Sequence, residues 1–335
     1  HYSYIWETTM NRRHFILSSG MLAAASLSPS VFAQGAKPSG PVTMVVGFPA
    51  GGGTDVLARL LGQQFSEAWG VPVVVENRPG AAGVIAARHV AKMNNDGNSL
   101  LVAHVNSHGI GPALRPDLGY SVEKDFTPLG LIGKTPTVLV GGPGQSAKTL
   151  KDLVALCKAQ PGKIVFGSAG TGSAQHLALE IFKAEAGIDA LHVPYSGSAP
   201  LMTDVMGGHI QYAFEGLTTA KPLIESGKLI ALGQTLQNRS KSLPDVPTIA
   251  EQGYPGFEAS IWFALVGPGG MSPAMVERIN ADFNKAMQAP ELVARLAQAG
   301  AEDGGGSAER LAEFMRSEQA KFAKVVKDAG ISVKD

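Results

Sequence analysis

Short apolar runs, glycine-rich turns and segments with apolar residues at helical spacing follow one another along most of the chain. This order limits the fold more than any other feature. Val42 to Phe48 (VTMVVGF) is a β-branched apolar run, typical of a strand buried on both faces of a parallel sheet. A glycine-rich turn follows, and apolar residues then recur at helical spacing from Val56 to Trp69. The order returns in VPVVVEN (71–77), a helix through Ile85 to Met93 and the strand Ser99 to His104. These units predict parallel βαβ packing in an α/β protein.

The same pattern restarts beyond Pro136 and predicts a second α/β lobe. Its predicted elements are TVLVGGP (137–143), a helix at 150–158, KIVFGSAG (163–170), a helix at about 173–186, LHVPY (191–195), a helix at 201–206, HIQYAFE (209–215), a helix at 220–225 and a strand at 229–233. After an irregular crossing, 257–268 predicts one more buried strand, and the tail is helical at 272–287, 290–298 and 309–329.

The helical tail has no strands from which to build a sheet, so we place it on the first lobe. The predicted lobes are then residues 40–136 plus 258–335 and residues 137–257. The chain crosses twice between them, and such a protein has a cleft between its lobes, where ligands bind near the carboxyl ends of strands.

Charge and cysteine content exclude several classes of protein. The 28 basic and 28 acidic residues give no electrostatic attraction to nucleic acid or to an anionic membrane. The one cysteine, Cys157, excludes an internal disulfide and a Cys-clustered metal site, and its apolar neighbours predict a core thiol. The 41 glycines and 21 prolines favour an α/β protein with many loops over a helical bundle.

The segment from Met10 to Ala33 has the pattern of an export signal: a basic pair, an apolar stretch without acidic residues, and a small-residue end. We set residues 1–33 aside as upstream residues and signal peptide. Arg12 and Arg13 resemble the twin-arginine type, and general secretory export is the alternative. No segment has the roughly 20 apolar residues of a membrane helix, so we predict a mature protein that is not embedded in a membrane.

Two glycine-rich loops join a predicted strand to a predicted helix: FPAGGGTD (48–55) and GSAGTGSAQH (167–176). Glycines expose successive backbone N–H groups, and a helix N-terminus adds partial positive charge, so each loop can hold a carboxylate or phosphate without lysine or arginine. Neither loop completes a nucleotide motif, since the first lacks the P-loop lysine and the second has Gln175 in place of the last glycine. The alternative is two tight turns. The candidate ligand-binding residues are Phe48, Pro49, Ala50, Gly52, Thr54 and Asp55 on one wall, and Ser168, Ala169, Thr171, Gly172, Ser173 and His176 on the other.

Further polar residues stand at predicted strand ends. His104 and His108 could hydrogen-bond a ligand or be ordinary loop histidines, and without a nearby carboxylate they do not indicate a metal site. Tyr195 is either a ligand contact or a packed aromatic residue. Glu215 ends a strand and is predicted to face the cleft, where it would favour a monoanionic ligand or one with a donor opposite its carboxylate. The alternative places Glu215 in solvent or in a pair within the protein.

A hydrolase is a further alternative, because Ser168, Ser173 and His176 are close in sequence. The chain has no G-x-S-x-G motif, and a serine at the start of a helix is most often a cap.

Several segments together resemble the extracytoplasmic solute receptors of tripartite tricarboxylate transporters, also called Bug receptors. They are FPAGGGTDVLARLLG, VVVENRPGAAGVIAA, HGIGPAL with KDFTPLGLIG, FGSAGTGSAQHLALEIFK, VPYSGSAPLMTDVMGGHI and LPDVPTIAEQGYPGFEASIWFALVGPGG. The resemblance covers essentially the whole mature chain. This chain has Asn106-Ser107-His108 where the family commonly has Ser-Thr-His, and Phe214-Glu215 where it usually has Phe-Asp. Both differences fall near the expected cleft, so the ligand cannot be copied from relatives. Ser107 is a further candidate ligand-binding residue.

The resemblance implies a two-lobe α/β fold of the periplasmic-binding-protein class (type II, Venus flytrap), with the ligand cleft between the lobes. It implies a periplasmic protein that captures a small organic carboxylate for the membrane subunits of a transporter, without catalysis. We accordingly expect no cofactor, no metal and a monomer. The alternative function is a periplasmic sensor that reports its ligand to a membrane histidine kinase.

Overall fold

The structure is a computed structural model that describes residues 37–332. By their contacts, residues from Lys37 onwards form one compact unit. The predicted export signal, residues 1–33, lies outside the described residues. Within residues 37–332, none of the helices is long and apolar enough to cross a membrane.

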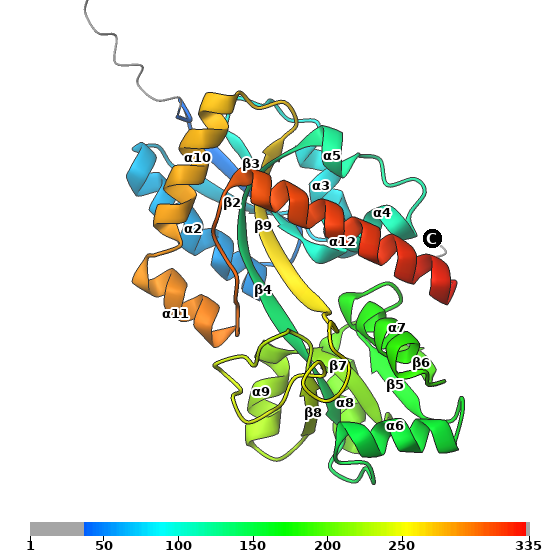
Figure 1. The fold of residues 1–335 in the computed structure, drawn as a ribbon. Coiled ribbons are helices and arrows are strands. Elements are labelled where there is room, and N and C mark those ends of the chain that lie inside the picture. The colour runs from blue at the N-terminus through cyan, green and yellow to red at the C-terminus, as the bar shows by residue number, and fades with distance from the viewer. Residues whose placement is uncertain (1–36, 333–335) are drawn as a thin grey trace, which may run out of the picture. The chain divides into compact units, whose positions relative to one another are not determined.

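The elements alternate along the chain in the order that the sequence pattern predicts (Figure 1). The strands are β1 (Val42–Val46), β2 (Val73–Asn77), β3 (Ser99–His104), β4 (Phe126–Gly141), β5 (Val165–Ser168), β6 (Leu191–Pro194), β7 (Tyr212–Gly216), β8 (Ile230–Gln234) and β9 (Ser260–Pro268). The helices are α2 (Gly53–Trp69), α3 (Val84–Val90), α4 (Gly111–Leu114), α5 (Val122–Asp125), α6 (Leu150–Ala159), α7 (Ala174–Ala186), α8 (Ser198–Gly207), α9 (Leu217–Glu225), α10 (Pro273–Ala286), α11 (Pro290–Gln298) and α12 (Ala308–Ala329). Two short turns of helix, η1 (Ala81–Gly83) and η2 (Asn106–Ile110), precede α3 and α4.

The strands of the described chain form one mixed sheet in the order β2-β1-β3-β9-β4-β7-β5-β6, with β8 also pairing β4. β1 is parallel to β2 and β3, and β5 is parallel to β6 and β7, which confirms the parallel βαβ packing predicted for the first units. β9 is antiparallel to both β3 and β4. The last predicted strand therefore returns to the first half of the sheet.

Strand β4 joins the two halves of the sheet, and here the sequence prediction was wrong. The pattern appeared to restart beyond Pro136, whereas Pro136 lies inside a 16-residue strand. Residues up to Pro136 pair with β9, and residues from Thr137 pair with β7 and β8. The register with β9 shifts between Pro128 and Gly130. Strands tolerate proline at positions where the pairing is irregular in this way.

The helices divide into two groups that β4 connects. We call β1–β3, β9, α2–α5 and α10–α12 the first lobe, and β5–β8 with α6–α9 the second lobe (Figure 1). The residue numbers predicted for the lobe boundaries remain a prediction.

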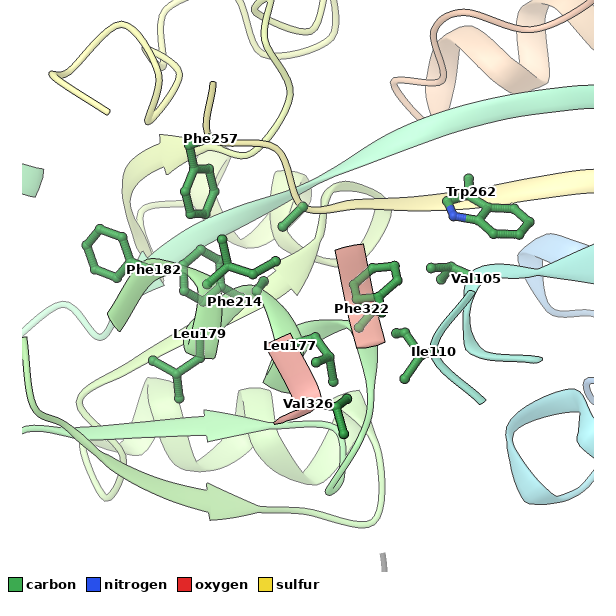
Figure 2. Close-up of a cluster of buried hydrophobic side chains, with 14 of the residues drawn as sticks. Val105, Ile110, Leu177, Leu179, Phe182, Phe214, Phe257, Trp262, Phe322 and Val326 are labelled. Atoms are coloured by element: carbon green, nitrogen blue, oxygen red, sulfur yellow. The ribbon is translucent and has the colours of Figure 1, made fainter. Parts of the chain in front are cut away.

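A buried apolar cluster contains residues from both lobes (Figure 2). Helix α7 contributes Leu177 and Phe182, β9 contributes Trp262, and α12 contributes Phe322 and Val326. Cys157 is also fully buried in this cluster, and burial raises the pKa of its thiol to about 11. Because the cluster packs α7 against β7 of the second lobe and α12 of the first lobe, it fixes the position of the α7 N-terminus.

Candidate functional site

A cavity of about 580 Å³ lies at the carboxyl ends of β1, β3, β5 and β6. Ligands favour this edge of an α/β sheet. The first lobe lines the cavity with Phe48, Pro49, Ala81, Ala82, Val84, His104, Asn106, Gly111, Leu114, Arg115 and Ile261, and the second lobe lines it with residues 169–175 and 196–198. Of the predicted site residues, the structure places Phe48, Pro49, His104, Ala169, Thr171, Gly172 and Ser173 in this wall.

A second cavity, of about 810 Å³, lies against α7 and α12, away from these strand ends. Most of its charged groups are already paired, for example Lys134 with Glu258 at 3.0 Å and Lys183 with Glu180 at 3.0 Å. Since paired charges attract a ligand weakly, we take the cavity at the strand ends as the candidate site.

The N-terminus of α7 forms the second-lobe wall. Ser173 caps the helix, because its hydroxyl accepts a hydrogen bond from the backbone N–H of His176. Ala174 and Gln175 form the first turn and line the cavity, and N–H groups at this position have no partner within a helix. Gly172 precedes the cap with a φ of +76° and donates its N–H to Nδ1 of His176 at 3.0 Å. The wall therefore offers backbone donors and the positive end of a helix to an anion.

Ser168 and His176, both predicted site residues, lie behind this loop and do not line the cavity. The ring of His176 stacks on that of His192, with centroids 3.7 Å apart, and Nε2 of His192 is 2.7 Å from Oγ of Ser168. Burial is the main cause that lowers the pKa of His192 to about 4. Ser168 is fully buried, and its hydroxyl also donates to the carbonyl of Gly170. These contacts support the loop. The Ser168–His192 pair does not present a serine nucleophile to the cavity, because Ser168 is buried.

A turn with an unusual backbone forms part of the first-lobe wall. Ala81 and Ala82 have φ values of +45° and +57°, and both line the cavity. Alanine rarely occupies this left-handed region, and such strain is often found at functional sites. A Cβ added at Gly47 would stand 2.6 Å from Cα of Gly83, so the turn packs directly on the end of β1. These alanines are not predictable from the sequence, because nothing local distinguishes them from any Gly-Ala-Ala-Gly segment.

Phe48 and His104 pack together on the same wall, with ring centroids 4.8 Å apart. Burial lowers the pKa of His104 to about 3, which keeps the ring neutral at ordinary pH. Its Nδ1 accepts the N–H of Asn106 at 3.1 Å, so the neutral ring carries its proton on Nε2. His104 can therefore donate one hydrogen bond without adding charge.

The rest of the predicted first wall turns away from the cavity: Ala50, Gly52, Thr54 and Asp55 do not line it. The buried Asp55 carboxylate instead accepts hydrogen bonds from Arg59 and Asn77, each at 2.9 Å, and from the N–H of Gly51. These bonds, that of Arg59 first, lower the pKa of Asp55 to about 2. Asp55 thus ties the turn at 50–55 to β2.

Ser107, His108 and Tyr195 also lie outside the cavity wall. His108 is fully buried, with Nδ1 2.9 Å from Oγ of Ser107, and its Nε2 has no hydrogen-bond partner among the described residues. The phenol of Tyr195 donates to Asp204 of α8 at 2.5 Å, and burial, followed by this hydrogen bond, raises the pKa of Tyr195 to about 12. Asp204 thus holds Tyr195 against the second lobe.

Glu215 stands behind the second-lobe wall and does not line the cavity. Its Oε1 accepts the hydroxyl of Ser198 at 2.9 Å and the N–H of Gly216 at 2.8 Å. Its Oε2 is buried and has no partner among the described residues, and burial raises the pKa of the carboxyl. Glu215 therefore positions Ser198, which does line the cavity.

Arg115 lines the cavity, although the two glycine-rich loops predict an anion site without arginine or lysine. Among the described lining residues it is the one with a permanently charged side chain, and none is acidic. Its signal in the sequence is Leu114-Arg115-Pro116, a cation at a forced helix end, which is weak without knowledge of the cavity.

Two buried histidines and one half-buried histidine predict loss of stability in acid. The pKa values of His104, His108 and His192 fall to about 3, 3 and 4, whereas an unfolded histidine titrates near 6.5. Below pH 6.5 the unfolded chain binds protons that the folded chain does not, so we expect stability to be complete above pH 6.5 and to fall towards pH 4. The slope is up to about 1.4 kcal/mol per pH unit for each histidine.

Urea denaturation between pH 7.5 and 4.5 measures this effect. The raised pKa values of Glu185, Glu215 and Glu302 act in the opposite direction, whereas the lowered pKa values of Asp55 and Glu180 act in the same direction as the histidines. A His192→Gln variant should show a shallower pH dependence than the wild type, and a stability that is constant from pH 7 to 5 would contradict the prediction.

Residues 57–331 match the family described as "Tripartite tricarboxylate transporter family receptor". Protein BugT of Bordetella pertussis is 36% identical over 321 residues, which is 96% of each chain. In the described part of the chain, no group of three His, Cys, Asp or Glu side chains could hold a metal ion.

Solved structures agree with this family. Rpa4515 of R. palustris, with adipate, superposes with a TM-score of 0.77 at 34% identity, covering 88% of this chain and 99% of its own. MatC of Rhodopseudomonas palustris, with bound malate, gives a TM-score of 0.73 at 30% identity, covering 86% and 99%. The predicted two-lobe binding-protein fold is confirmed. The chain belongs to the tripartite tricarboxylate transporter receptor family, the family of the Bug receptors.

Proposed function

We propose that this protein is an extracytoplasmic receptor that captures a small organic carboxylate in the cavity at the strand ends. The observation that carries the proposal is the wall of this cavity, which presents the first turn of α7 and Arg115 but no acidic side chain among its described residues. A volume of about 580 Å³ lies within the usual range for small-molecule sites. A carboxylate is the group that such a wall favours.

Two relatives support the ligand class. Their structures contain adipate and malate, which are small carboxylic acids of different length and polarity. Their difference also means that the class can be transferred to this chain but the particular acid cannot.

We further propose that the receptor works in the periplasm and delivers its ligand to the membrane subunits of a transporter. The family description and the predicted export signal support this placement. The sensor alternative uses the same site, so it changes the partner and leaves the ligand chemistry as proposed.

Thermal denaturation of refolded, ligand-free protein tests the proposal. At a ligand concentration 100 times Kd, binding stabilises the folded state by about 2.7 kcal/mol, which for a chain of this size raises Tm by roughly 5 °C. We expect mono- and dicarboxylates to give such shifts, and the fully amidated form of the same acid to bind about 1.5–3 kcal/mol more weakly. A chelator should change nothing. Equal shifts with acid and amide, or none with any carboxylate, would contradict the proposal.

A further inference from the structure

One imidazole holds the loop before α7 from behind the cavity wall. The backbone N–H of Gly172, a residue that lines the cavity, donates to Nδ1 of His176 at 3.0 Å. We propose that His176 is a positioning residue for ligand binding: its neutral ring holds the loop at 169–173 in the binding conformation, and protonation of the ring releases the loop and weakens binding. This inference rests on the proposed function.

The surroundings of His176 select one tautomer of its neutral ring. The nitrogen that accepts the N–H of Gly172 carries no proton, so the proton of the neutral ring is on Nε2. Nε2 lies 3.6 Å from Oε1 of Glu180, and a carboxylate beside a ring nitrogen favours the proton on that nitrogen. Burial acts to raise the pKa of Glu180, but His176 and Lys183 together lower it, so Glu180 remains ionised in mild acid.

The same loop has a second support, which fixes its other end. The hydroxyl of Ser168 accepts the N–H of Gly170 at 3.2 Å and lies 2.7 Å from Nε2 of His192. The rings of His192 and His176 stack, with centroids 3.7 Å apart. Gly172 has a φ of +76°, and glycine also populates other backbone regions readily, so its peptide unit can rotate once the N–H loses its acceptor. The contact with His176 therefore keeps the end of the loop next to α7 in one conformation.

Protonation of His176 removes the acceptor that the loop requires. The added proton goes to Nδ1, which then faces the N–H of Gly172 as a second donor across 3.0 Å. Two donors at this distance repel each other, so the loop has to move. The new positive charge does not compensate by attracting an anionic ligand, because Glu180 lies beside the same ring and neutralises it. We therefore expect acid to weaken ligand binding through His176.

Other titratable groups around α7 either keep their protonation state in mild acid or are common to all the variants below. In the described structure, β5 and β9 carry no titratable side chain. His192 of β6 stays neutral, because burial, and next the charge of His176, lower its pKa to about 4. Burial raises the pKa of both Tyr212 and Glu215 on β7, so Tyr212 stays protonated and Glu215 can take up a proton in every variant alike. Charged groups that face α7 across the second cavity are in ion pairs: Lys321 with Glu318, Lys324 with Asp328, and Lys134 with Glu258.

Isothermal titration between pH 7.5 and 5.0 tests the inference, with circular dichroism as the check on folding at each pH. The probe is whichever of succinate, malate and adipate binds the wild type most tightly. In His176→Asn, Oδ1 can take the place of Nδ1 as acceptor, and the side chain does not titrate. His176→Leu has a similar shape without an acceptor. His209→Asn is the matched control, because His209 is exposed, lies beyond the end of α8 and does not line the cavity.

At pH 7.5 we expect His176→Asn to bind within about threefold of the wild type. His176→Leu should bind at least about tenfold more weakly, because the N–H of Gly172 then lacks an acceptor. Between pH 7.5 and 5.0 the wild type and His209→Asn should lose at least about fivefold more affinity than His176→Asn, since one linked proton changes affinity by up to about tenfold per pH unit. Protonation of the ligand is common to all proteins and cancels in this comparison, which does not require His176→Leu to fold.

Equal pH dependence in the wild type and His176→Asn would overturn the inference, because a merely structural histidine gives that result. Wild-type affinity that rises in acid relative to His176→Asn would also overturn it, since the charge of His176 would then attract the ligand. If the wild type binds a carboxylate and all the variants bind it alike, the inference fails and the proposed function stands. If the wild type binds none of the three acids, the proposed function itself fails.

Discussion

Gly172→Val is expected to lower ligand affinity at least about a hundredfold while the protein stays folded. Gly172 has a φ of +76°, which valine adopts only with strain, and it lines the cavity. Its N–H is also fixed by Nδ1 of His176, so relieving the strain must move the loop that leads into the first turn of α7. The backbone donors of the second-lobe wall would then no longer converge on the carboxylate. Titration calorimetry, with circular dichroism as the check on folding, measures the effect.

Gly187→Val is the matched control, because Gly187 ends the same helix in the same backbone region, with a φ of +59°. No atom lies within 4 Å of a Cβ added there, and Gly187 does not line the cavity. We expect this variant to lose stability with unchanged affinity. Gly52 offers no such test, since its φ is −73° and it lies outside the wall. Wild-type affinity in Gly172→Val, or equal loss in both glycine variants, would remove the loop from the site.

Local sequence signals were sufficient for most elements. The strand Ser99–His104 and the helix Pro290–Gln298 have the predicted bounds, because an unbroken apolar run and a proline start mark them directly. The part of strand β4 before Thr137 was not predicted, because the sequence pattern restarts beyond Pro136. Its continuity depends on pairing with β9, whose residues lie more than a hundred positions later in the chain, and no local pattern records that pairing.

The candidate site was predictable only where one segment both builds and faces the cavity. The loop at 169–173 is such a segment, since the strand before it and the helix after it fix its direction. The turn at 50–55 is also glycine-rich but turns away, because Asp55 is tied to Asn77 of the neighbouring strand. Arg115 reaches the wall through the packing of η2 and α4, which is equally a property of the tertiary structure.

Phe322→Ala is expected to reduce the free energy of unfolding by about 3–5 kcal/mol, the usual cost of truncating a buried phenylalanine. Phe322 is 2% exposed, and its ring, with that of Trp262, packs so closely over Gly109 that a Cβ there would meet Cδ2 of Phe322 at 3.3 Å. The neighbouring backbone cannot easily move into the space left by the ring, because η2 continues directly into α4. We therefore expect a cavity to remain, which places the loss in the upper part of the range.

The position of Phe322 also predicts how the loss is distributed. Its cluster contains Leu177 of the second lobe and Trp262 of the first, as Figure 2 shows. Truncation should therefore lower the stability of both lobes, and urea denaturation followed by tryptophan fluorescence and by circular dichroism should shift to the same extent. Val293→Ala, at a side chain that is 48% exposed on α11, is the control and should change stability by less than about 0.5 kcal/mol. A loss below about 1 kcal/mol for Phe322→Ala, or a shift seen by one probe only, would show that α12 does not join the two lobes energetically.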